Sequence, residues 1–358
     1  MKRIDDSNLR ENRSNRSNRN NENGLSHRKN ILRRVMIAVT TAAVILFLVM
    51  GTRFISPTMT ASKEQILVNG TIFQYADDLG LRTADEKGLV TKLDRSVTHD
   101  GLTLKVPVVV YDGTRVVIGI ERQTSEEKYL KEKVIDNISG TDILINGESL
   151  QFYAPKGHSL GYYMNPSEDV NTTFIRLFDA HNQGGKAFPD KFQLTLTVTV
   201  SGISEPFKFN IPVVKMTNEN LDMTPDVTRT YETVRLTLEK VEITPITTNI
   251  TTRVTLPEYM RILSSASHLG FAIYDDKGNE MRQIGGDGAY PTGSIGNIMV
   301  MDSQFEPFVT MPRFITIKTY KNIMQKGDQS QFELDENGKE KRMYFPALDI
   351  TLPMTKAE

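Results

Sequence analysis

The sequence predicts an all-β ectodomain of two β-sandwiches, preceded by one transmembrane helix and a short juxtamembrane helical segment. Three observations lead to this prediction. An uncharged apolar run occupies residues 35–52, apolar and polar side chains alternate in many short segments after residue 96, and no long amphipathic helices separate those segments. Because strands of a parallel sheet are usually joined by such helices, the last observation disfavours a nucleotide-binding α/β fold.

Residues 35–52 read VMIAVTTAAVILFLVMGT, with no charge between Arg34 and Arg53. Crossing the hydrocarbon core of a bilayer takes roughly 17–25 helical residues, and flanking arginines extend a short span by snorkelling to the headgroups. A cleaved signal peptide and a buried soluble helix are the alternatives. The long charged stretch before the run, and the poor cleavage candidate at residues 59–61, favour an uncleaved anchor.

Basic residues concentrate before this run. The first 34 residues hold ten Lys/Arg and four Asp/Glu, a net charge of +6, whereas residues 54–358 hold 32 basic and 40 acidic residues, a net charge of −8. By the positive-inside rule we expect a cytoplasmic N-terminus, an extracytoplasmic C-terminal region and a single-pass protein of the cell membrane. The residues expected to fix this topology and contact lipid headgroups directly precede the span: Arg28, Lys29, Arg33 and Arg34.

The predicted cytoplasmic tail, residues 1–34, is rich in Asn, Arg and Ser between residues 7 and 23. It offers no apolar face whose burial could offset the entropy of ordering, so we expect a disordered basic tail. Contact with anionic lipid or nucleic acid through arginine, and contact with a transcription factor, are alternatives. Since no aromatic residues lie between the arginines, a nucleic-acid partner is not expected.

Residues 53–95 are predicted as a linker followed by a helical segment. Pro57 lies in a Ser/Thr-rich stretch, and apolar residues at helical spacing follow from Ala76 to Leu93. Two glycines, Gly80 and Gly88, interrupt this helical pattern. Four acidic residues are expected to solvate its exposed face: Asp77, Asp78, Asp85 and Glu86.

Residues 96–216 are predicted as the first β-sandwich. Apolar residues alternate with other residues over 102–110, and Asp112-Gly113 then supplies a hairpin turn, because both residue types tolerate positive φ. A second alternating pair of segments covers residues 192–200 and 207–213. This period of two indicates half-buried antiparallel strands.

A polar stretch, residues 217–225, is predicted as a linker to a second β-sandwich at residues 226–355. Alternation breaks after Leu238 and resumes at Val241, which predicts a β-bulge near Glu239-Lys240. Further strands are expected at Gly270–Tyr274, Phe314–Tyr320, Gln331–Leu334, Arg342–Phe345 and Ala347–Leu352.

No residue pattern indicates catalysis, a cofactor or a metal ion. The chain has no cysteine, which excludes disulfides, thiolate metal sites and a cysteine nucleophile, and no two of its five histidines have the spacing of a HExxH metal pair. The histidines are therefore interpreted as surface or loop residues. The stretch around Ser294 lacks the spacing of a nucleophile elbow.

Three further stretches have a simple structural interpretation. Residues 285–296 contain five glycines with no lysine or helix following to hold phosphate, so we expect a flexible loop. Asp275-Asp276 and Asp335-Glu336 are expected to stabilise turns. Calcium binding is the alternative for these acidic pairs, although neither matches an EF-hand loop.

Residues 77–121 contain DDLGLRTADEKGLVTKLDRS, a strand opening SVTHDG, and the hairpin YDGT. In these motifs the chain resembles a family of membrane-anchored ectodomains of unknown function from spore-forming Gram-positive bacteria. The segment VRLTLEKVEITPITTNI, residues 234–250, resembles the opening of an immunoglobulin-like module that commonly follows in that family. The resemblance implies that the second predicted sandwich is immunoglobulin-like, and we expect two immunoglobulin-like β-sandwiches in all.

Members of that family look like the transmembrane regulators encoded beside extracytoplasmic-function sigma factors. The resemblance therefore implies a non-enzymatic ectodomain that binds or senses an envelope ligand, with a cytoplasmic sigma factor or regulator as partner. The chain departs from the anti-sigma pattern in having no His-x-x-x-Cys-x-x-Cys zinc motif and a short tail poor in apolar residues. A structural or adhesive protein of the cell wall is the alternative function.

Overall fold

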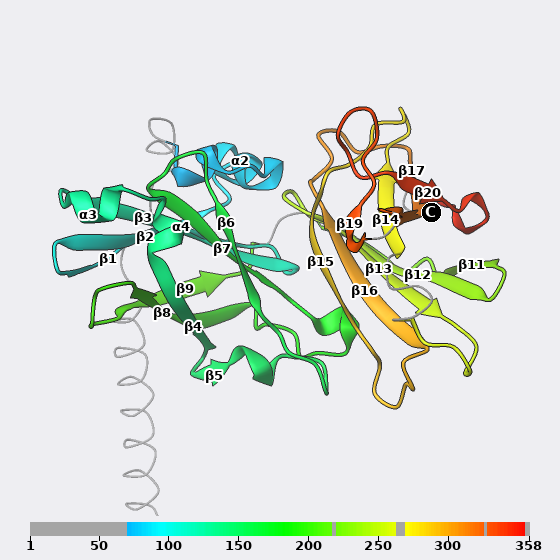
Figure 1. The fold of residues 1–358 in the computed structure, drawn as a ribbon, viewed down its shortest axis with the longest axis horizontal. Helices are drawn as coiled ribbons and strands as arrows, with labels where there is room; N and C mark the ends of the chain where they lie inside the picture. Colours follow the sequence, from blue (N-terminus) through cyan, green and yellow to red (C-terminus); the bar gives the residue numbers. More distant parts are fainter. Residues whose placement is uncertain (1–69, 217–219, 263–268, 326–327, 355–358) are drawn as a thin grey trace, which may run out of the picture. The chain divides into compact units, whose positions relative to one another are not determined.

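The computed structural model describes residues 70–216, 220–262, 269–325 and 328–354. These residues belong to one compact unit, Asn69–Glu358. They consist mainly of β-strands (Figure 1), so the all-β prediction is confirmed. The predicted tail and transmembrane helix, residues 1–34 and 35–52, lie outside the described residues. Within the described ranges, no helix is long and apolar enough to cross a membrane.

The first β module consists of antiparallel strands with short helical turns between them. The strands are β1 (Thr91–His99), β2 (Leu102–Tyr111), β3 (Arg115–Thr124), β4 (Ile138–Ile145), β5 (Glu148–Ser149), β6 (Tyr162–Pro166), β7 (Thr172–Phe178), β8 (Lys191–Val200) and β9 (Phe207–Val214), and the turns are α3 (Glu127–Leu130), α4 (Val134–Asn137), η3 (Leu150–Phe152) and η4 (His181–Gln183).

These strands form two sheets, ordered β1-β2-β3-β7-β6 and β5-β4-β8-β9. Side chains of both sheets meet in one apolar core, with Leu104 and Ile118 from the first sheet and Leu196 and Phe209 from the second. The alternation of β8 and β9 is the predicted one, since every second residue is buried. The hairpin predicted at Asp112-Gly113 joins β2 to β3.

Strand β2 corrects the predicted phase of residues 102–110. The β2–β3 register shifts between Lys105 and Val108, around Pro107, which has no N–H to donate to the ladder. Beyond this irregularity Val109 contributes to the core between the sheets, whereas Val108 and Val110 face the opposite side. The outer face of the first sheet is therefore apolar as well.

A helical segment covers this outer face. It comprises η2 (Ile72–Tyr75) and α2 (Leu79–Glu86), and its residues Phe73 and Leu81 are fully buried in a cluster with Val110 and Phe174. The segment ends earlier than the predicted boundary at residue 95, because β1 already begins at Thr91 and pairs there with Val109.

The second β module follows. Its strands are β10 (Leu221–Met223), β11 (Val227–Tyr231), β12 (Val234–Ile243), β13 (Thr248–Thr255), β14 (Leu269–Tyr274), β15 (Gln283–Ala289), β16 (Ile298–Phe305), β17 (Phe314–Asn322), β18 (Met324–Gln325), β19 (Asp328–Phe332), β20 (Arg342–Tyr344) and β21 (Ile350–Pro353), and a 3-10 turn, η5 (Pro346–Leu348), precedes β21.

One large sheet has the order β10-β12-β13-β16-β15, with β11 also on β12, and the second has the order β14-β17-β20, with β21 also on β17; β18 and β19 form a separate two-stranded sheet. Their shared core includes Leu238, Ile250, Phe271 and Ile317. The predicted bulge is confirmed, because the β12–β13 register shifts between Leu238 and Lys240.

Two predictions in this half of the chain are wrong. The predicted linker, residues 217–225, contains β10, whose Leu221 pairs with Ile243 of β12; the polar composition hid a short edge strand. The glycine-rich stretch is not simply a loop, because residues 283–289 form the edge strand β15 on β16. Its glycines serve close packing, as described below.

Candidate functional site at the junction of the two modules

A cluster of buried charged side chains lies where the two modules and the helical segment meet. Asp78 is the N-cap of α2, where its Oδ1 accepts from the N–H groups of Gly80 (2.9 Å) and Leu81 (3.3 Å). Its Oδ2 lies 2.6 Å from Nη1 of Arg115, which is fully buried. An acidic residue that was expected to be solvated is therefore 1% exposed and pairs with an internal arginine.

Arg115 joins three parts of the chain. From β3 it reaches Asp78 of the helical segment, and it also donates through Nε to Thr247 Oγ1 (2.9 Å) and through Nη2 to the Ile246 carbonyl (2.9 Å) of the second module. Gly80 permits this approach, because a Cβ there would lie 2.0 Å from the Ile246 carbonyl oxygen. The glycine that interrupts the helical pattern is thus required by packing.

A second arginine completes this charge cluster. Arg176 of β7 places Nη2 3.2 Å from Asp78 Oδ2. Burial and the neighbouring Arg115 lower the pKa of Arg176 to about 10, so it remains charged at neutral pH. Although burial opposes ionisation of Asp78, Arg115 and Arg176 hold the pKa of that carboxyl below its ordinary value. Two cations share one buried carboxylate, an arrangement that is sensitive to loss of the anion.

Side chains of the first module also cover the edge strand β15 of the second. Arg176 Nη1 donates to the Ile284 carbonyl, Gln183 Nε2 donates to the Asp287 carbonyl (3.1 Å), and the Tyr290 N–H just beyond β15 donates to His158 Nε2 (2.9 Å). A Cβ at Gly285 would lie 2.3 Å from Cζ of Phe178. Gly285 therefore allows the edge to approach the first module closely.

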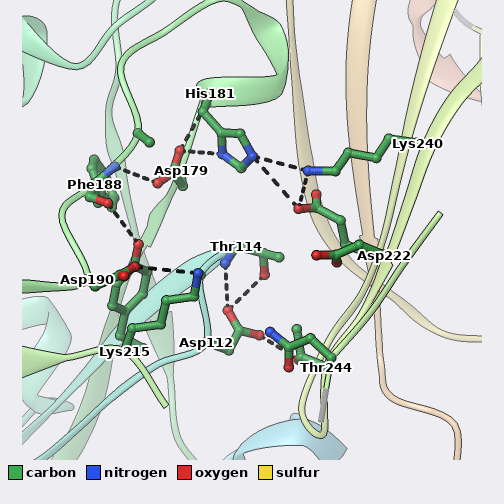
Figure 2. Close-up of a pocket in the computed structure, with 15 residues that line it drawn as sticks. Asp112, Thr114, Asp179, His181, Phe188, Asp190, Lys215, Asp222, Lys240 and Thr244 are labelled. Atoms are coloured by element: carbon green, nitrogen blue, oxygen red, sulfur yellow. Dashed lines mark hydrogen bonds and ion pairs between the residues drawn. The ribbon is translucent and has the colours of Figure 1, made fainter. Parts of the chain in front are cut away.

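Beside these contacts lies an open polar cavity of about 200 Å³ (Figure 2). The hairpin turn after β2 and the loop carrying η4 supply its lining from the first module, and β10 and β12 supply it from the second. The side chains drawn in Figure 2 include Asp112, Thr114, Asp179, His181, Asp190, Lys215, Asp222, Lys240 and Thr244.

A chain of charged contacts crosses this cavity from one module to the other. His181 Nδ1 lies 2.8 Å from Asp179 Oδ1, and Lys240 Nζ lies 3.4 Å from His181 Nε2 and 2.6 Å from Glu242 Oε1. The hydrogen bond with Asp179 raises the pKa of His181 above its ordinary value. Burial opposes ionisation of Glu242, but hydrogen bonds from Lys240, Asn249 and Asn182 bring its pKa below the ordinary value.

The Asp179–His181 pair has the orientation of a general-base dyad, so its surroundings matter for chemistry. Nε2 of the histidine faces Lys240 and Glu242, and Asp179 Oδ2 accepts from the Phe188 N–H at 2.7 Å. Asp112 is likewise satisfied by Thr114, Arg115 and Thr244. The buried acids of the cavity are occupied in joining protein groups, and no set of three potential metal ligands occurs in the described ranges. These side chains therefore form a structural junction between the two modules.

The structure tests several of the residue predictions. Asp275 Oδ1 accepts from the N–H groups of Lys277 and Asn279, and Asp335 does the same at its own turn, so turn stabilisation is confirmed. Ser294 Oγ accepts from the Gly296 N–H at 3.1 Å within a turn. His181 lies in the loop carrying η4, as interpreted, but its side chain is only 29% exposed and takes part in the charged junction. The topology residues Arg28, Lys29, Arg33 and Arg34 lie outside the described residues.

Family models match two parts of the chain. Residues 31–124 match a domain of unknown function (DUF4179), and residues 221–355 match a family of unknown function (DUF5643). The two stretches that carried the family resemblance, residues 77–121 and 234–250, fall inside these matches. The resemblance to uncharacterised domains is thus supported.

No curated protein matches the chain significantly. Among solved structures, the conserved domain protein from Bacillus anthracis aligns with 80% of this chain and 99% of its own, with a TM-score of 0.53 and 15% identity, which indicates a similar fold. Bovine butyrophilin aligns with 69% of this chain and 94% of its own, but the TM-score of 0.18 at 6% identity carries no argument.

Proposed function

We propose that the chain is a non-enzymatic single-pass membrane protein whose ectodomain binds or senses a component of the cell envelope and signals through its span to a cytoplasmic regulator of the sigma-factor type. The proposal includes an immunoglobulin-like arrangement for both modules, which their paired antiparallel sheets support. The uncharged run at residues 35–52 and its basic flank support the membrane placement.

One observation favours sensing over passive attachment. The helical segment that follows the predicted anchor is bonded to both modules, through Asp78 to Arg115 and through Asp77 to Arg282 of the second module (2.6 Å). In addition, the Leu79 N–H at the start of α2 donates to Glu306 Oε1 (2.8 Å). A ligand that shifted the second module would therefore act directly on the helical segment that follows the predicted anchor in the sequence.

The membrane placement is tested by labelling, because the chain has no cysteine of its own. Single-cysteine variants Ser14→Cys in the tail and Ser201→Cys in an exposed turn of the ectodomain are expressed in intact cells and treated with a membrane-impermeant maleimide. We expect labelling of Ser201→Cys alone, and of both variants after lysis. Equal labelling of both variants in intact cells would contradict the proposal.

Signalling is tested with the full-length chain. Purification from membranes is expected to recover a sigma factor, and removal of residues 1–34 is expected to abolish that recovery. If a tail-deleted chain retained all its cellular effects while remaining bound to the wall, the adhesive alternative would replace the signalling proposal.

A further inference from the structure

Asp302 lies on β16 at the junction and is 6% exposed. Its carboxyl group receives hydrogen bonds from Thr251 Oγ1 (2.5 Å), Asn249 Nδ2 (3.4 Å) and Gln183 Nε2 (3.4 Å), the last from the first module. All three partners are neutral. Asp302 thus differs from Asp78, whose negative charge is matched by arginines.

Two buried acceptors near Asp302 lack a donor. Oδ1 of Asn249, whose Nδ2 contacts Asp302, has no hydrogen-bond partner, and neither has Oε1 of Gln304; both residues are 2% exposed. Gln304 and Asp302 line a small cavity of about 10 Å³ together with Gln183. A carboxylate can only accept hydrogen bonds, whereas a protonated carboxyl group donates one. Protonation of Asp302 would therefore add a donor to a region in which these two acceptors have none.

The charges around Asp302 favour the same protonation state. Asn249 Nδ2 also donates to Glu242 Oε2 (3.0 Å), so a single amide lies between two carboxyl groups. With His181 and Asp302 both protonated, two carboxylates face two cations across the junction. With both deprotonated, three carboxylates face one ammonium group. Besides Asp302, the charged groups in this count come from the η4 loop and from β12: Asp179, His181, Lys240 and Glu242. Asp287, an exposed aspartate on β15, was not counted and adds one more negative charge in either state.

We propose that Asp302 and His181 bind protons in the docked structure, and that losing these protons loosens the docking of the second module on the first. This inference concerns the junction alone and does not depend on the proposed membrane placement. It makes the junction between the two modules sensitive to pH near neutrality.

The direction of the pH dependence follows from the pKa shifts of these two groups. Burial raises the pKa of Asp302 from 3.8 to about 6, and the hydrogen bond with Asp179 raises that of His181 above 6.5. Both groups therefore bind protons more tightly in the folded structure than in an unfolded chain. Their contribution to stability is complete below pH 3.8 and 6.5, respectively, and is lost as pH rises through the folded pKa values. For Asp302 the difference corresponds to roughly 100-fold tighter proton binding.

The test uses the full-length chain in detergent, with two spin labels on introduced cysteines at the exposed positions Glu148→Cys and Lys339→Cys. Between pH 5 and pH 8 we expect the distance distribution between the labels to broaden. In the variant Asp302→Asn, the amide supplies a donor without a charge, so the distance distribution is expected to stay narrow at pH 8. Asp222→Asn, an exposed cavity residue, is the matched control and is expected to broaden like the parent chain.

An unchanged distribution in the parent chain between pH 5 and pH 8 overturns the proposal, as does broadening of Asp302→Asn equal to that of Asp222→Asn. If Asp302→Asn fails to fold, the carboxyl chemical shift of Asp302 is followed in the parent chain by carbon-13 NMR. A midpoint near pH 6 supports the proposal, and a midpoint near pH 4 overturns it.

Discussion

Replacing Asp78 by asparagine is expected to separate the charge of this residue from its role as a helix cap. Asparagine is as good an N-cap as aspartate, so the bonds from the Gly80 and Leu81 N–H groups can persist. What disappears is the anion opposite Arg115, which is fully buried, and Arg176, which is 7% exposed. Removing one partner of a buried ion pair costs about 3–5 kcal/mol, because the other charge stays buried without compensation.

The assay is urea unfolding of the full-length chain in detergent at pH 7, followed by circular dichroism. With a slope of a few kcal/mol per molar urea, the expected loss lowers the midpoint of Asp78→Asn by about 1 M or more. The neighbouring variant Asp77→Asn is the control, because the Asp77 side chain is 73% exposed and its pair with Arg282 is a surface ion pair. Equal midpoints for the two variants would refute the reasoning that the buried charge cluster stabilises the junction.

Three further variants test other features of the junction. Gly80→Ala is expected to destabilise the chain by about 1–3 kcal/mol despite alanine's better helix propensity, because its Cβ would collide with the Ile246 carbonyl. Gly161→Ala, where nothing lies within 4 Å of the added Cβ, is the control, and both variants are compared by thermal unfolding. Ile246→Ala should cost about 2–5 kcal/mol, since this side chain is fully buried, whereas Val309→Ala, 89% exposed in the parent chain, should change little. The pKa of Glu242 is lowered in the folded structure, so its contribution to stability is present above pH 4.5 and is lost as pH falls through the folded value. Glu242→Gln should therefore be less stable than the parent chain at pH 7 and should lose less further stability in acid. A dependence of stability on acid pH identical to that of the parent chain would contradict this.

Much of the β structure could be predicted from the sequence because one face of most strands is buried. Strands β8 and β9 show clean alternation, and the bulge in β12 is visible as a break in phase. Strand β7 is buried at every position, so it shows no alternation, and its seven residues were not predicted as a strand. Strand β15 was hidden for the opposite reason, because its glycines reflect close packing, of Gly285 against Phe178 of the first module and of Gly286 and Gly288 against β16, and not an intrinsic strand preference.

The junction was not predictable because its residues come from distant parts of the chain. Asp78 and Arg115 are separated by 37 positions, and Arg115 and Thr247 by 132. The residues adjacent to Asp78 are typical of a solvated helix start, and none of them indicates that the aspartate pairs with a buried arginine. The one available signal was the N-cap pattern itself, an aspartate just before a helical run, which predicts a bonded carboxylate without naming its partner.

The way β15 is covered has a consequence for how this protein can be divided. An exposed strand edge offers unpaired backbone groups to any other strand that meets it, and proteins guard such edges to avoid self-association. Here the edge is covered by side chains of the first module, among them Arg176 and Gln183, which donate to its carbonyl groups. A fragment beginning at residue 221 would carry this edge without the side chains that cover it, so it should self-associate more readily than the intact chain.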